Sequence, residues 1–217
     1  MCIRDSRGGM CGSHESHQGN AGVCRNPADL QTVKPHHQDR SQSIKSIIDE
    51  YKSAKLLYEL GESEWKMSTV LSKRQVEKLM MTDVGESDEI IDCCSKNGYK
   101  IIDFDDKAYP KRLKEIINPP AVLYVDGELP DIDNLVCIGM VGTRKASEYA
   151  IKAAHIMAKG ITEAGALVVS GGALGIDTYS HLGALACGGK TVAVLGNGLG
   201  NNYLKANEGL RNMIKQS

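Results

Sequence analysis

The stretch VVSGGALGIDTYSH, residues 168–181, decides how the rest of the chain is interpreted. An apolar run ends at Ser170, a glycine-rich loop follows, and Asp177 and His181 then stand one helical turn apart. A strand, a glycine loop and a helix start in this order are typical of the turns in a parallel α/β sheet. The stretch fits three kinds of site: a loop that cradles phosphate, the acid/base pair of an enzyme, or a tight structural turn.

Strands and helices alternate on both sides of this stretch. Apolar runs at 135–142, 166–170 and 191–196 predict strands, and 147–165, 176–189 and 205–215 predict helices. Ser147 is expected to cap the first of these helices, with Gly165 past its end. The long apolar run 135–142 predicts a strand buried on both faces. The alternation indicates an α/β fold, a Rossmann-like doubly wound parallel sheet at least three strands wide, with 121–125 as a candidate fourth strand.

The chain is expected to have three parts. Residues 1–40 show no periodicity and are interpreted as a disordered, non-native leader; their Cys11, His14, His17 and Cys24 are spaced irregularly for zinc, so no metal site is expected. Residues 41–98 have short helical periods and predict a small helical domain, and 99–217 form the Rossmann-like domain. The α/β pattern stops midway, which predicts that a complete fold adds strands at the C-terminus.

Composition limits the classes of function. Aromatic residues make up 5% of the chain, which disfavours a base-stacking platform built on several rings. No apolar stretch reaches the roughly 18 residues that span a bilayer, so no membrane association is expected. Seven cysteines without a C-x-x-C pair indicate a reducing, cytoplasmic compartment and no disulfides. Residues 135–217 hold eight Lys and Arg against four Asp and Glu, which favours an anionic partner there.

Three glycine-rich loops, 141–147, 170–177 and 196–205, follow the predicted strands. The carboxyl ends of parallel strands share one edge of a sheet, where ligands bind. Glycines permit close backbone approach, and helix N-termini favour anions. We therefore expect a phosphate-bearing ligand. The candidate binding residues are Gly142, Thr143, Arg144, Lys145, Ser170, Gly171, Gly172, Gly175, Gly196, Asn197, Gly198 and Lys205.

Catalytic and cofactor motifs are not found. The chain has no G-x-G-x-x-G, no G-x-x-x-x-G-K-[ST] and no G-x-S-x-G, so no cofactor and no catalytic residue are assigned. Asp177 and His181 share a helix face and fit either an acid/base pair or structural support of the loop. Support is favoured, because no further catalytic group is placed beside them.

With these residues in place, the region from about residue 100 to 215 resembles the DNA-processing protein A (DprA/Smf) family. The matching motifs are YPKRLKEIINPPAVLYVDG, VGTRKASEYA, VVSGGALGIDTYSHLGAL, GGKTVAVLGNGL and NNYLKAN. The resemblance implies a non-enzymatic bacterial protein that binds single-stranded DNA. Its expected roles are protection of incoming strands in natural transformation (competence) and loading of the RecA recombinase, with a homodimer possible at full length.

The resemblance also implies residue roles. Arg144 stands where the family sets an arginine against the DNA backbone, Lys205 is the second basic contact, and the loop 171–175 forms the pocket floor. Leu174 departs from the Arg or other large polar residue of many members. Leu204 departs from the usual Pro and weakens the assignment of Lys205.

Two alternatives stay open at this point. One is a nucleotide-cleaving phosphoribohydrolase on a related fold, although its PGGxGTxxE stretch is not found here. The other is a fragment that does not fold alone.

Overall fold

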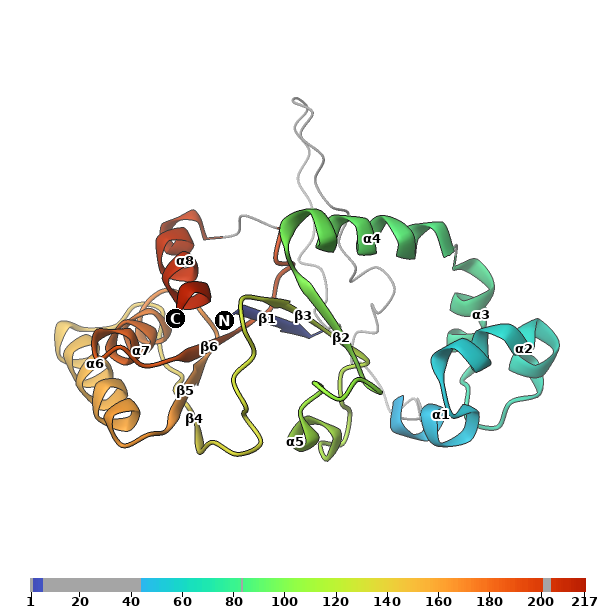
Figure 1. Ribbon diagram of the computed structural model, residues 1–217, viewed down its shortest axis with the longest axis horizontal. Helices are drawn as coiled ribbons and strands as arrows, with labels where there is room; N and C mark the ends of the chain where they lie inside the picture. Colours follow the sequence, from blue (N-terminus) through green and yellow to red (C-terminus); the bar gives the residue numbers. More distant parts are fainter. Residues whose placement is uncertain (1, 6–43, 83, 201–203) are drawn as a thin grey trace, which may run out of the picture.

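The computed structural model describes residues 2–5, 44–82, 84–200 and 204–217. A short strand comes first, helices follow it, and the remaining strands then largely alternate with helices (Figure 1). The helices are α1 (Ile44–Tyr51), α2 (Ala54–Met67), α3 (Lys73–Met81), α4 (Val84–Asn97), α5 (Lys111–Lys114), α6 (Glu148–Glu163), α7 (Ile176–Ala186) and α8 (Glu208–Gln216), with a 3₁₀ turn η2 (Lys205–Asn207). The strands are β1 (Cys2–Asp5), β2 (Lys100–Asp103), β3 (Val122–Asp126), β4 (Cys137–Gly139), β5 (Leu167–Ser170) and β6 (Thr191–Leu195).

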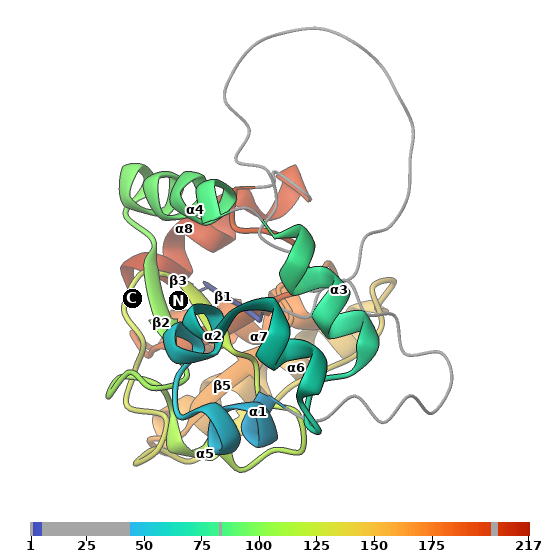
Figure 2. The same cartoon turned by 90° about the vertical axis from the view of Figure 1, so that its right-hand side faces the viewer.

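The helices α1 to α3 lie on the opposite side of the sheet from α6 to α8 in Figure 1, and Figure 2 shows them in front of it. Trp65 is buried in this part and its indole N–H donates to the carbonyl of Leu57 at 2.6 Å. Ser72 and Gln75 form a reciprocal capping box at the start of α3, a local signal strong enough to define the helix boundary. Helices therefore occupy the region where helical periods predicted them, while the division into domains stays a prediction.

The six strands form one sheet in the order β2-β3-β1-β6-β5-β4. Strands β1, β6, β5 and β4 run parallel, and β3 is antiparallel to both β1 and β2. The Rossmann-like parallel arrangement is confirmed, and the antiparallel pair at one end makes the complete sheet mixed.

Two expectations about the strands are wrong. Cys2–Asp5 form β1, hydrogen-bonded between β3 and β6, so these four residues do have regular structure; the rest of the leader, with Cys11, His14, His17 and Cys24, lies outside the described residues. The run 135–142 is not buried on both faces. Its strand β4 is the edge of the sheet, and Val136 and Val141 are 66% and 85% exposed.

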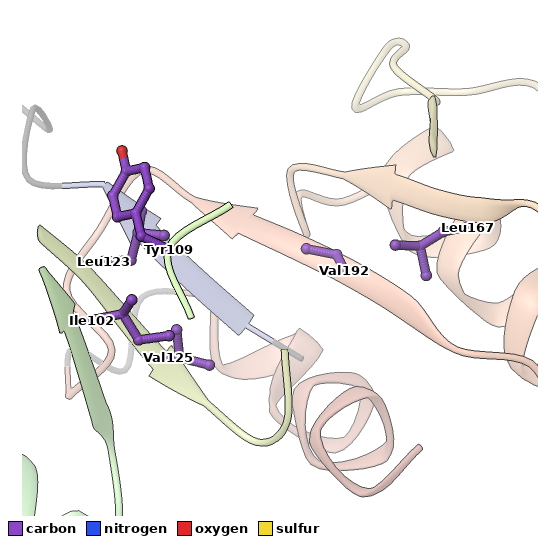
Figure 3. Packing of buried hydrophobic residues seen from close by; sticks show 6 residues of the cluster. All are labelled: Ile102, Tyr109, Leu123, Val125, Leu167 and Val192. Carbon is purple, nitrogen blue, oxygen red and sulfur yellow. The ribbon is translucent and has the colours of Figure 1, made fainter. Parts of the chain in front are cut away.

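Alternate residues of the central strands pack against two different layers. Val168 packs with Ala158 of α6 and Ala184 of α7, and Ala193 packs with α8. The neighbouring residues on the strands, Leu167 and Val192, belong to a second cluster on the opposite face (Figure 3). Its other buried members are Ile102, Tyr109, Leu123 and Val125. This period of two fixes which side of the sheet each strand residue faces.

Helix α6 begins and ends as its sequence predicts. The Ser147 hydroxyl accepts the N–H of Ala150 at 3.3 Å, and Gly165 follows the helix with φ +83°. Cys93 departs from expectation because it is disulfide-bonded, whereas Cys94, Cys137 and Cys187 are free. Among the described residues, no helix combines the length and apolar character needed to cross a bilayer.

Candidate functional site

Three loops leave the carboxyl edge of the parallel strands. They connect β4 to α6, β5 to α7, and β6 to η2. Because β4, β5 and β6 are mutually parallel, the loops emerge at the same edge of the sheet.

The first loop packs directly on the second. The N–H of Ile176 donates to the carbonyl of Thr143 at 3.2 Å. A Cβ atom at Gly142 would lie 2.5 Å from Cγ1 of Ile176, and a Cβ atom at Gly175 would lie 2.3 Å from the carbonyl oxygen of Thr143. Residue 175 also has φ +79°, in the region that favours glycine. Gly175 is needed because the backbones of the two loops touch there, and Gly142 because the side chain of Ile176 fills the space that a Cβ atom would take.

The second loop is held in shape by its own helix. The carboxylate of Asp177, 8% exposed, accepts the N–H of Ala173 at 3.3 Å. The hydroxyl of Thr178 donates to the carbonyl of Ala173 at 2.7 Å. Gly172 is buried with φ +69°. These contacts are compatible with the supporting role predicted for Asp177.

The third loop is joined to the second through Asn207, a residue that sequence reasoning missed. Its side-chain amide donates to the carbonyls of Gly172 at 3.0 Å and Ala173 at 3.2 Å. An Asn directly before a helix indicates an N-cap from sequence alone. The structure shows no side-chain cap at that helix, so no local signal could have revealed this contact.

The charged candidates lie at the surface of this edge. Arg144 and Lys145 of the first loop are exposed, and Lys205 is exposed at the start of η2. In the third loop Gly196 is exposed, and the side-chain amide of Asn197 donates to the carbonyl of Gly198 at 3.2 Å. Gly171 of the second loop is exposed as well. Cationic side chains and exposed glycine backbone are the chemistry that binds phosphate.

Ser170 differs from the other candidates because it is buried. It is 4% exposed, and its hydroxyl donates to the carbonyl of Met140 at 2.7 Å, which ties the end of β5 to the end of β4. Its hydroxyl forms a hydrogen bond within the sheet and does not face the loop surface.

His181 lies below the loops. It is fully buried, and its Nδ1 is 2.8 Å from the hydroxyl of Thr191 at the start of β6. Since the Thr191 hydroxyl donates to the carbonyl of Val168, Nδ1 is the donor to Thr191. Burial lowers the pKa of His181 from 6.5 to about 4, so the ring is neutral near pH 7. The hydrogen bond joins α7 to β6, so whatever support His181 gives the loop acts through the helix.

This arrangement does not favour catalysis or metal binding by the Asp177 and His181 pair. Asp177 bonds the loop backbone, and the hydrogen bond of His181 goes to Thr191. Within the described ranges, no group of three or more His, Cys, Asp or Glu side chains is placed to hold a metal ion.

The fold and this edge define a Rossmann-like α/β protein with three interlocked glycine loops. The family model for DNA recombination-mediator protein A matches residues 100–217, and the chain belongs to that family. The family resemblance predicted from the motifs is thereby confirmed.

Relatives with known names cover the same region. The chain is 40% identical over 109 residues to DNA processing protein DprA of Streptococcus pneumoniae, covering 50% of this chain and 38% of the relative. It is 35% identical over 112 residues to DNA processing protein DprA of Bacillus subtilis, covering 52% of this chain and 38% of the relative. The chain thus matches well under half the length of either protein.

A solved structure supports the fold. The X-ray structure of DNA processing protein A from Streptococcus pneumoniae is 29% identical to the chain, with a TM-score of 0.61, and covers 80% of this chain and 58% of that one.

Proposed function

We propose that the chain binds single-stranded DNA along the carboxyl edge of its parallel sheet, with the phosphates at the three glycine loops. The observation that supports this most is the locking of the loops into one surface, through Thr143 and Ile176 on one side and Asn207 on the other. Membership of the DNA recombination-mediator protein A family agrees with DNA as the ligand.

The phosphate contacts are assigned to Arg144, Lys145 and Lys205. All three side chains are exposed, and residues 135–217 carry a net charge of +4. Contacts of this kind release counterions from the nucleic acid, so affinity falls steeply as the salt concentration rises.

Exposed apolar side chains on the same segments favour a single strand over a duplex. Val141 at the start of the first loop and Tyr149 just after it in α6 are 85% and 82% exposed, and Leu174 of the second loop is 39% exposed. Unstacked bases offer faces that such side chains can cover, whereas a duplex keeps those faces inside its stack. Leu174, unexpected in a loop that binds phosphate, has a role here as a contact for a base.

The proposed role is binding without catalysis. The hydroxyl of Ser170 is buried against Met140, and His181 is neutral and enclosed, so neither faces the proposed ligand. The alternative of a nucleotide-cleaving phosphoribohydrolase predicts release of free base from nucleoside monophosphates. Chromatography of such an incubation distinguishes the two functions.

The wider role follows from the family resemblance. We propose that the complete protein acts in the cytoplasm, protects incoming strands in natural transformation and hands them to RecA, with homodimerisation as a further step. Strand-exchange assays with RecA on a full-length version, together with its mass in solution, test these proposals.

The central test is the affinity for fluorescein-labelled oligo-dT, measured by anisotropy over a series of salt concentrations. We expect Arg144→Ala to weaken binding by roughly 1–2 kcal/mol, as for loss of a charge-assisted hydrogen bond to phosphate. Each lost contact should reduce the slope of log K against log salt by about 0.7.

The matched control is Lys190→Ala, which removes one exposed positive charge directly before β6, at the opposite edge of the sheet. It should leave affinity and slope almost unchanged. If the double variant Arg144→Ala, Lys205→Ala binds as tightly as the unaltered chain, the DNA site is elsewhere.

A further inference from the structure

The side chain of Asn207 bridges segments that are far apart in the sequence. It is 4% exposed, and its Nδ2 contacts the Gly172 carbonyl at 3.0 Å, the Ala173 carbonyl at 3.2 Å and the Thr178 hydroxyl at 3.0 Å. These acceptors precede Asn207 by 29 to 35 residues. A buried amide with this number of backbone acceptors orders both segments that it joins.

The contacts converge on Ala173 in the middle of the second loop. Its N–H is held by Asp177, and its carbonyl accepts from both Thr178 and Asn207. The Thr178 hydroxyl donates to Ala173 and therefore accepts from Asn207. Asn207 joins this network from η2, the turn that follows the third loop.

The same residue fixes the backbone that presents Lys205. The N–H of Asn207 donates to the carbonyl of Leu204 at 2.9 Å, and Arg211 donates to that carbonyl at 3.3 Å. Leu204 has φ +59°, a conformation that a non-glycine residue holds only when its surroundings impose it. Lys205 thus lies in a turn that the Asn207 backbone closes, and the side chain of the same residue is anchored on the second loop.

We propose that Asn207 is a positioning residue that couples Lys205 to the glycine loop, so that the two bind one strand of DNA as a unit. The proposal rests on the proposed function, since it assigns how that site is held together. It names a residue that contacts no DNA itself and acts through Lys205 and Ala173.

The chemistry of the contact requires an amide. Asn207 donates to two carbonyls, whereas an Asp of the same shape would set an acceptor oxygen against both of them. The substitution Asn207→Asp thus reverses the contact without changing the volume. Asn212→Asp is the matched control, because Asn212 is exposed on α8 and the change adds the same charge without touching the loop.

The experiment measures oligo-dT affinity for Asn207→Asp, Lys205→Ala and the double variant at several salt concentrations. We expect Asn207→Asp to weaken binding about tenfold and to lower the salt slope by about 0.7, the contribution of one phosphate contact. Once Asn207→Asp is present, Lys205→Ala should cost little more, because the coupled contact is already lost. Asn212→Asp should bind nearly as the unaltered chain does.

Thr178→Val serves as a second variant in case Asn207→Asp fails to fold. It removes one partner of Asn207 from α7, leaves the third loop unaltered, and should reduce affinity in the same non-additive way with Lys205→Ala. Hydrogen exchange provides a readout that needs no DNA. The peptide spanning residues 171–177 should exchange faster in Asn207→Asp and Thr178→Val, and at the normal rate in Lys205→Ala.

The proposed coupling is wrong if the losses of DNA affinity are additive in the double variant. It is also wrong if amide hydrogen exchange in residues 171–177 is unchanged in Asn207→Asp. Failure of the proposed function has a different signature. In that case Lys205→Ala and Arg144→Ala leave DNA affinity unchanged, while the exchange of the loop still responds to Asn207→Asp.

Discussion

The contact between the first and second loops predicts that Gly175→Ala damages both stability and DNA binding. A Cβ atom at Gly175 would lie 2.3 Å from the carbonyl oxygen of Thr143 and 2.8 Å from that of Arg144. Backbone atoms do not move aside as the end of a flexible side chain does. The φ of +79° adds strain for any L side chain.

The size of the expected loss in stability follows from the steric contact and the backbone strain. A backbone conformation with positive φ costs a non-glycine residue roughly 1–2 kcal/mol, and forcing an extra carbon into a packed contact costs about 1–3 kcal/mol. The free energy of unfolding should therefore fall by about 2–5 kcal/mol. The first loop must shift to admit the methyl group, so the backbone of Arg144 moves and oligo-dT affinity should fall as well.

Substitutions at two other glycines allow the backbone strain and the steric clash to be measured separately. Gly188 has φ +72° with nothing within 4 Å of its Cβ position, so Gly188→Ala tests the conformational strain alone. Gly196 is open and has no positive φ, so Gly196→Ala should change stability by less than about 1 kcal/mol.

Urea denaturation followed by circular dichroism measures all three variants. With a slope of about 2 kcal/mol per molar urea, Gly175→Ala should unfold about 1 M or more below the unaltered chain. An unfolding free energy equal to that of Gly188→Ala would refute the clash between the loops, and normal DNA affinity would refute its link to Arg144.

Two further predictions concern His181 and Tyr149. Burial lowers the pKa of His181 from 6.5 to about 4, so the folded state favours the neutral ring; its contribution to stability is complete above pH 6.5 and is lost as the pH falls toward 4. In urea titrations the free energy of unfolding should fall by about 2–3 kcal/mol across that pH window. The fall should be clearly smaller in His181→Asn, and an equal pH dependence of the two proteins would contradict the prediction. Tyr149→Ala should weaken oligo-dT binding by roughly 1–3 kcal/mol if the ring stacks on a base, while Tyr149→Phe should keep most of the affinity, and equal affinities of both variants would exclude stacking.

Local patterns were sufficient for the individual elements. The alternation of apolar runs and helical periods predicted β5, β6, α6 and α7 close to their observed bounds, because side-chain periodicity reports which face an element buries. Ser147 and Gly165 marked the ends of α6 for the same local reason, since a cap needs only its neighbours in sequence.

Sequence patterns led to wrong predictions where the neighbours of a residue come from distant parts of the chain. An apolar run cannot distinguish a central strand from an edge strand, so β4 was expected to be buried although Val141 is 85% exposed. Cys2–Asp5 show no alternating pattern, and their place in the sheet depends on pairing with β3 and β6.

The sequence by itself determined the α/β class, the three glycine loops at one edge and the cations Arg144 and Lys205 within them. Only the tertiary structure decided how these loops become one surface. It places Ser170 inside the sheet, requires glycine at 175 against the first loop, and joins Asn207 to Ala173 across 34 residues. The reason is physical. Side-chain periodicity and the backbone freedom of glycine are local properties that neighbouring residues set. Burial, steric contact and hydrogen-bond partners depend on which distant segments folding brings together.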